Sequence, residues 1–160
     1  MTAEAWSNFF VAQCGASAAL LGLLFVSVSL NLARILALPS LPERALLAML
    51  LLLAVLVVAS LMLIPGQPMR ACGIETLAAG ALIAAATLAA KRRASLAPAG
   101  RRNFIVDLAL LTGATLPYFI AGGLMVAGLE AGFDWLAAAM LLSTVKSVSD
   151  AWVLLVEINR

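Results

Sequence analysis

Five long stretches of mainly apolar residues alternate along this chain with short segments that contain prolines or charges. The stretches cover about residues 9–31, 45–64, 72–90, 104–128 and 135–158. Each is close to or above the roughly 20 residues that an α-helix needs to cross a bilayer. The pattern predicts an all-α integral membrane protein, in which a single domain, residues 1–160, forms a compact bundle of about five transmembrane helices. Four spans and a surface helix are disfavoured because the end of the chain is so apolar.

The composition supports this class and removes several kinds of chemistry. Of the 160 residues, 64% are hydrophobic and 11% are charged, and the mean hydropathy is +1.11. A soluble domain of this length could not bury so much apolar surface in one core. The chain has no histidine, and its two cysteines are too few for a disulfide framework or a thiolate metal site. We therefore expect no metal and no cofactor.

Basic residues are concentrated between the third and fourth stretches, in the segment 91–103. Five of the ten in the chain lie there: Lys91, Arg92, Arg93, Arg101 and Arg102. Between two spans, such a segment indicates an inner loop that contacts lipid headgroups, rather than a nucleic-acid site. Alternation of the spans then predicts an N-terminus outside and a C-terminus inside.

The last stretch contains two charges near its middle, Lys146 and Asp150. At the centre of a membrane helix each charge costs about 2.5–3.5 kcal/mol on insertion scales, so neither should face lipid. Their four-residue spacing puts both on one helical face. Ser143 and Ser147 flank the same side, and Glu157 continues it toward the inner boundary. This stretch is therefore predicted to turn a polar face toward the other helices.

Polar residues also mark the first and fourth stretches, whereas the second stretch has almost none. Gln13 and Asn31 lie near the two ends of the first stretch, and Asp107 lies about one turn inside the basic boundary of the fourth. If the polar faces meet, the first, fourth and fifth helices form the interior, and the second is the lipid-facing helix. The alanines and glycines of the third stretch predict tight packing against a neighbour.

Two residues have the spacing of a known catalytic motif, but the other sequence features of that motif are missing. Ser143 and Lys146 match the SxxK spacing of penicillin-binding enzymes. The companion KTG sequence is absent, and the match lies in a predicted membrane span. The sequence also contains no glycine-rich phosphate loop and no HExxH pair. We expect that the protein is not an enzyme and that it has no catalytic residue.

The two ends of the chain carry a family resemblance. The start, WSNFFVAQCGASAALLGLLFVSVSLNL, and the end, SDAWVLLVEINR, resemble those of small, mostly uncharacterised bacterial inner-membrane proteins. Some of these are labelled modulators of the FtsH membrane protease. The resemblance implies a multi-pass protein of the bacterial inner membrane and offers modulation of a protease as a function. It implies no catalytic residue.

Three roles for Lys146 and Asp150 stay open at this point. The two residues form a structural ion pair, line an ion or proton pathway, or dock on another membrane protein. Our working hypothesis is a pathway in a homo-oligomer, because five short spans leave little room for a pore. The pathway would use the polar faces of the first, fourth and fifth helices. The alternative is a non-catalytic regulatory or assembly subunit that binds another membrane protein, such as a membrane protease.

Overall fold

The computed structural model describes the backbone of residues 3–37, 41–94 and 101–158, and the side chains within these ranges except residues 3–4, 90–111 and 157–158. The described residues form helices and turns, without any strand. The elements are η1 (Ala3–Trp6), α1 (Ser7–Leu30), α2 (Leu32–Ala37), α3 (Leu41–Met62), α4 (Met69–Ala94), α5 (Arg101–Val126) and α6 (Ala131–Ile158). The predicted all-α class is confirmed over this part of the chain.

Four of these helices are long and apolar enough to cross a membrane, namely α1, α3, α4 and α6. The candidate span in α6 runs from Ala131 to Val156, so the last stretch of the chain is long enough to span a bilayer. In α5, the apolar segment within the described side chains covers Thr112–Val126. The chain is thus an all-helical protein with four candidate membrane-spanning helices.

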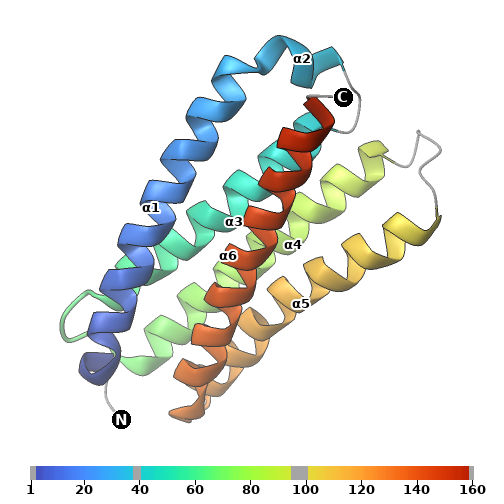
Figure 1. Cartoon of the computed structure of the whole chain (residues 1–160). Coiled ribbons are helices and arrows are strands. Elements are labelled where there is room, and N and C mark those ends of the chain that lie inside the picture. Colours follow the sequence, from blue (N-terminus) through green and yellow to red (C-terminus); the bar gives the residue numbers. More distant parts are fainter. Residues whose placement is uncertain (1–2, 38–40, 95–100, 159–160) are drawn as a thin grey trace.

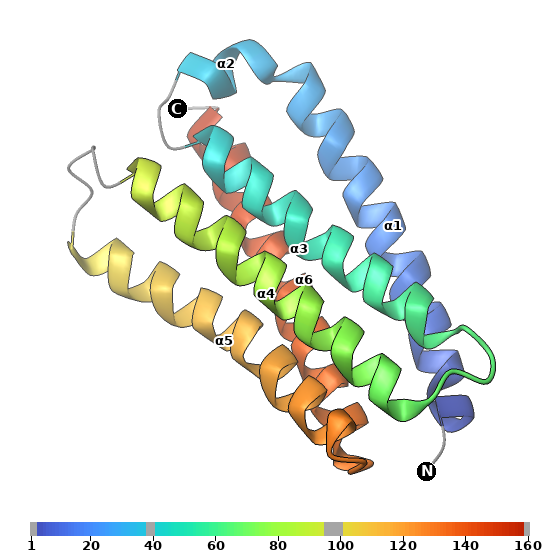
Figure 2. The ribbon, with the colours of Figure 1, turned by 180° about the vertical axis from the view of Figure 1, so that it is seen from behind.

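Helices α3 to α6 form an up-and-down ring in which each packs against the next, and α6 closes the ring on α3. Helix α1 lies outside the ring along α3 (Figures 1 and 2).

The end of the bundle that holds α2, the end of α4 and the start of α5 is called the basic end here. It is defined by Arg34, Arg44, Lys91, Arg92, Arg93, Arg101 and Arg102. The N-terminus and the α5–α6 turn lie at the opposite end (Figure 1).

The helix ends differ from the predicted limits mainly at the basic segment. Helix α4 continues to Ala94 and α5 begins at Arg101, so the predicted loop 91–103 is shorter than expected. Lysine and arginine are good helix formers, and positive charge is favoured at a helix C-terminus, which lets α4 run on. At the opposite end, Gly66 and Gly128 have φ angles of 73° and 79° in the two connections. Glycine adopts this left-handed conformation without steric cost.

Tight packing of the third predicted span is confirmed where α4 crosses α5. A Cβ atom added to Gly73 would lie 2.8 Å from the carbonyl oxygen of Gly122, and one added to Gly80 would lie 3.1 Å from Cβ of Tyr118. The two backbones are therefore in direct contact, as small residues allow in membrane helix pairs. Helix α5 is helical throughout, including at Pro117.

The prediction that the second stretch is the lipid-facing helix was wrong. In the most apolar part of α3, 44% of the residues are buried, the largest share among the four candidate spans, against 17% in α1. Lipid tails are as apolar as leucine, so an apolar helix gains nothing by facing lipid, and packing decides its position. Ala45, Ala48 and Ala59 on the buried face of α3 let its neighbours approach closely.

Candidate functional site

A polar face of α6 is buried inside the bundle. Ser143, Lys146, Ser147 and Asp150 are 0%, 7%, 1% and 6% exposed. Their spacing of three, four and seven residues puts them on one side of the helix, as the sequence predicts. That side is turned toward the two helices that flank α6 in the ring, α3 and α5. The four side chains are therefore enclosed by a single protomer.

The centre of this face is an ion pair between Lys146 and Asp150. The Nζ atom of Lys146 donates to Oδ1 of Asp150, one helical turn further along α6. In the low dielectric of a helix bundle, each charge would be very costly without the other. The pair neutralises itself within one helix, so α6 carries its own compensation for the two buried charges.

Ser147 joins the pair to α3. Its hydroxyl donates to the carbonyl oxygen of Ala48 over 2.9 Å. Ala48 is 0% exposed to solvent because α6 covers it. Its short side chain lets the hydroxyl of Ser147 reach the backbone of α3. The hydrogen bond fixes the relative position of the two helices beside the charges.

Ser143 joins the same face to α5. Its hydroxyl lies 3.4 Å from the hydroxyl of Tyr118 and 3.5 Å from the carbonyl oxygen of Ala114. Sequence reasoning missed Tyr118, which is fully buried. It is the single tyrosine of the chain and lies well inside an apolar stretch. Tyrosines of membrane proteins are enriched at the membrane–water interface. A tyrosine deep inside an apolar stretch is therefore a sequence signal for a buried polar contact.

The structure separates the two residues of the SxxK pattern chemically. The hydroxyl of Ser143 contacts α5, whereas the ammonium of Lys146 is held by Asp150. A lysine that acts as a base toward serine must be neutral and must face the hydroxyl. Because the Nζ atom of Lys146 is engaged by Asp150 and not by Ser143, this arrangement does not prepare Ser143 as a nucleophile.

A further polar group lies in the bundle on α4. Thr87 is 8% exposed, and its Oγ1 atom has no hydrogen-bond partner among the residues that the structure describes. Antiparallel packing of α3 and α4 brings Leu50 and Ala86 to the same groove, so Thr87 is close to the level of Ala48. The buried polar groups of α4 and α6 therefore occur at a similar depth.

From the middle of the bundle to the opposite end, the interior is mainly apolar, although Thr76 of α4 is fully buried there and the Oε2 atom of Glu75 is buried without a hydrogen-bond partner among the described residues. A cluster of aliphatic and aromatic side chains from α1, α3, α5 and α6 fills it, including Phe10, Val58, Met125, Phe133 and Leu136. The rings of Trp6 and Phe133 stack with centroids 6.4 Å apart. Packed hydrocarbon from this cluster therefore lies between the polar groups of α6 and the opposite end, beside the polar groups of α4.

The predicted polar residues of α1 do not reach the ion pair. Helix α1 packs on α3 and touches α6 only slightly. Gln13 and Asn31 are half-buried, and the Nδ2 atom of Asn31 donates to the carbonyl oxygen of Ser27 in its own helix. Helices α5 and α6 meet as predicted, but α3 takes the place expected for the first span.

Several predicted site residues have side chains outside the described part of the structure. The backbone puts Asp107 in the first half of α5 and Glu157 in the last turn of α6. It also puts Lys91, Arg92 and Arg93 in the last turns of α4, and Arg101 and Arg102 at the start of α5. Where side chains are described, no group of three or more histidine, cysteine or acidic residues could hold a metal ion.

A scan of protein-family models and searches of curated proteins and solved structures found no match to this chain. The resemblance of its two ends to small bacterial inner-membrane proteins therefore stays a prediction. The class that the fold defines is a small polytopic helical bundle with membrane-compatible helices and a buried charge pair.

Proposed function

We propose that this protein is a five-span membrane protein that moves a proton or a small ion through the interior of the protomer. The observation that carries the proposal is the Lys146–Asp150 pair, two titratable groups enclosed in the middle of a span. Ionisable residues inside a membrane are rare and commonly belong to ion or proton pathways. Two aliphatic residues would insert at a lower cost and would pack as well.

The topology of the proposal follows from length and charge. Helix α5 has 26 residues, which is enough for a fifth span. The basic end carries most of the lysines and arginines and is therefore placed in the cytoplasm. The N-terminus is then outside, the C-terminus inside, and the proposed location is the bacterial inner membrane that the resemblance implies.

A proton at Asp150 would be the elementary event of such a pathway. Protonation removes the negative charge and releases the ammonium of Lys146 from its partner. The hydroxyls of Ser147, Ser143 and Tyr118 offer further donors and acceptors along the helix. Toward the opposite end the cluster around Phe10 and Phe133 interrupts this route, although Thr76 and Glu75 of α4 are polar groups on that side, so transfer requires the bundle to rearrange there.

The burial of the pair also bears on the competing ideas. A pathway inside the protomer does not need the central axis of a homo-oligomer, and oligomer formation stays an untested expectation. Docking on another membrane protein through Lys146 and Asp150 is disfavoured, because the two side chains are 9% and 8% exposed. A regulatory subunit would have to bind its partner through another surface.

Flux measurements in liposomes test the proposal. Purified protein is reconstituted with a pH-sensitive dye inside, and proton or cation flux is driven by a potassium diffusion potential. We expect flux from the wild type and only the protein-free baseline from the double variant Lys146→Met/Asp150→Leu. The control is Ser149→Ala, because Ser149 is exposed on the same helix and its hydroxyl donates to the carbonyl oxygen of Val145, one turn back along α6.

The double variant is the informative one, because it removes both charges without leaving either uncompensated. Its folded state is checked by circular dichroism and by gel filtration in detergent. Wild-type flux from the folded double variant contradicts the proposal. The absence of flux from folded wild-type protein contradicts it as well.

A further inference from the structure

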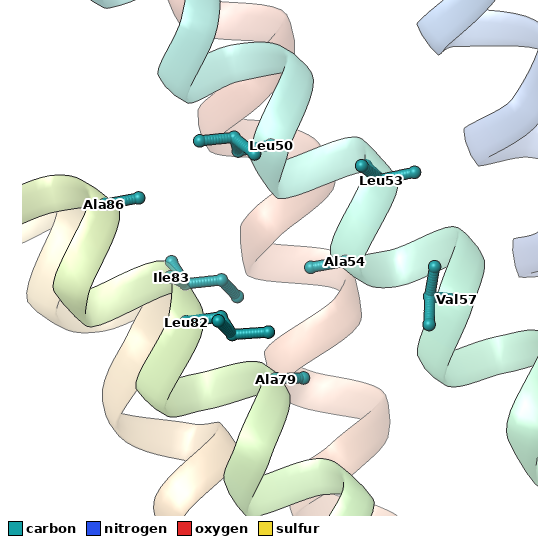
Figure 3. A pocket seen from close by; sticks show the side chains of 8 residues that line it. All are labelled: Leu50, Leu53, Ala54, Val57, Ala79, Leu82, Ile83 and Ala86. Atoms are coloured by element: carbon teal, nitrogen blue, oxygen red, sulfur yellow. The ribbon is translucent and has the colours of Figure 1, made fainter.

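A groove opens between α3 and α4, the two neighbouring helices of the ring that touch each other least. Its volume is about 160 Å³. Ile83, which is buried, lies at its base, while Leu53 and Leu82 are exposed beside it (Figure 3). The short side chains of Ala54 and Ala86 leave the space open. All of these residues belong to candidate membrane spans, so the groove faces the bilayer interior.

The side chains that line the groove are leucine, isoleucine, valine and alanine. They offer no hydrogen-bond donor or acceptor, so the occupant must be apolar where it lies between the helices. In a bilayer the material that surrounds such a surface is the hydrocarbon of lipid acyl chains. A recess between helices holds such a chain by shape and van der Waals contact, because hydrophobic transfer contributes nothing within the membrane.

Charged residues continue both walls of the groove toward the basic end. Arg93 follows Ala86 by seven residues and Leu82 by eleven, so its position has the same helical register on α4 as these two groove residues. Glu43 precedes Leu50 by seven residues, on the groove side of α3. At the helical rise, both positions lie about 10 Å beyond the groove lining, along the direction in which an acyl chain continues to its headgroup.

Positive charge prevails at that level. Lys91, Arg92 and Arg93 lie in the last turns of α4, and Arg44 follows Glu43 in the first turn of α3. On the ends of α3 and α4 the sequence thus has four basic residues and one carboxylate. Clusters of this kind at the end of membrane helices attract anionic lipid headgroups.

We propose that the groove between α3 and α4 binds one acyl chain of an anionic phospholipid, whose phosphate lies at the level of Arg93. The apolar recess and the basic end supply the two parts of such a ligand at the right separation. This inference rests on the insertion of the helices in a bilayer and is independent of any pathway through Lys146 and Asp150. A lipid bound here would fill the side of the ring where neighbouring helices touch least.

Native mass spectrometry of the detergent-solubilised protein, titrated with defined lipids, tests this site. We expect one molecule of phosphatidylglycerol to be retained more tightly than phosphatidylcholine of the same chain length. Arg93→Gln should weaken phosphatidylglycerol binding about fivefold, the equivalent of about 1 kcal/mol per basic residue near anionic lipid. Arg70→Gln is the control, because Arg70 is exposed on the same helix at the opposite end. Equal retention of the two lipids, or equal effects of the two variants, overturns the proposal.

The acyl-chain part of the site is tested by filling the groove. Ala86→Phe should lower the affinity for phosphatidylglycerol, because the ring occupies the space of the chain. Ala85→Phe is the matched control, since Ala85 is exposed on α4 and does not line the groove. If Ala86→Phe leaves lipid binding unchanged and instead abolishes a dimer seen by crosslinking, the groove belongs to a second copy and the proposal fails.

A substitution at Glu43 tests whether the bound headgroup is anionic. The carboxylate of Glu43 repels an anionic lipid, so Glu43→Gln should raise the affinity for phosphatidylglycerol by a few fold, to a similar degree as one basic residue contributes. The opposite result, a loss of affinity together with preference for phosphatidylethanolamine, means that Glu43 binds an amine. That outcome overturns the assignment to an anionic lipid.

Discussion

The two halves of the bundle interior are held together by different chemistry. Toward the opposite end, Phe10 and Phe133 pack with aliphatic side chains, and the backbones of α4 and α5 touch at Gly73 and Gly122. Toward the basic end, α6 presents an ion pair and two serines to its neighbours. One half is mainly apolar, although it also encloses Thr76 and the Oε2 atom of Glu75 on α4, and the other is organised by charge.

This difference follows from what a bilayer rewards. Apolar contacts between membrane helices replace equally apolar contacts with lipid, so the apolar half gains stability only through close fit. In the polar half, each charge and hydroxyl would be unsatisfied in lipid, so partners hold the helices in position. The apolar half should therefore be sensitive to side-chain size, and the polar half to charge.

The largest expected effect is the removal of one charge in the polar half. Asp150→Asn leaves Lys146 buried without its counter-ion, and the free energy of unfolding should fall by about 3–5 kcal/mol. Equilibrium unfolding in mixed micelles, followed by circular dichroism, measures the change. The double variant Lys146→Met/Asp150→Leu should recover most of the loss, because no charge remains.

Recovery of the free energy of unfolding in the double variant distinguishes an effect of charge from an effect of side-chain size. Asparagine is close to aspartate in volume, so the single change alters little except the charge. If the double variant is as unstable as Asp150→Asn, the two residues do not act as a pair. The contrast between the two halves would then lose its basis.

A middle-sized effect is expected from a change of volume in the apolar half. A Cβ atom at Gly122 would lie 2.6 Å from Cγ of Leu77 and 2.8 Å from the carbonyl oxygen of Gly73. Gly122→Ala should therefore lower the free energy of unfolding by about 1–3 kcal/mol, since a well-packed contact must shift. The same unfolding measurement applies.

Gly123→Ala is the matched control for this change. A Cβ atom at Gly123 meets nothing within 4 Å, so alanine there should be neutral or should stabilise the helix by about 0.5–1 kcal/mol. Equal losses in the two variants would mean that helix flexibility, and not the α4–α5 contact, sets the sensitivity of this half.

The helices and the polar face of α6 were predictable because both depend on local sequence. Long apolar runs predict helices, and the five predicted stretches overlap α1, α3, α4, α5 and α6. The spacing of Lys146 and Asp150 predicts a shared face for the same reason. Burial of that face follows from the cost of charge in lipid.

The neighbours of each helix were not predictable from the same patterns. Apolarity does not tell a lipid-facing helix from an enclosed one, so α3 was expected outside although it lies at the centre of the contacts. Gln13 and Asn31 suggested that the first helix meets the polar face of α6, yet α1 packs on α3 and touches α6 only slightly. Tyr118 was missed because its partner, Ser143, comes from another helix.

The smallest expected effect concerns the hydroxyl that Ser147 presents to α3. Ser147→Ala removes its hydrogen bond to the carbonyl oxygen of Ala48, and the loss should be about 0.6 kcal/mol, the average for such bonds between membrane helices. The carbonyl of Ala48 also accepts the backbone N–H four residues on, so it is not left unsatisfied. Ser149→Ala should change less, because that hydroxyl is exposed and bonds within α6. Unfolding measurements on both variants decide whether charge alone dominates the polar half. A loss for Ser147→Ala as large as that for Asp150→Asn would contradict the expectation that the polar half is sensitive mainly to charge.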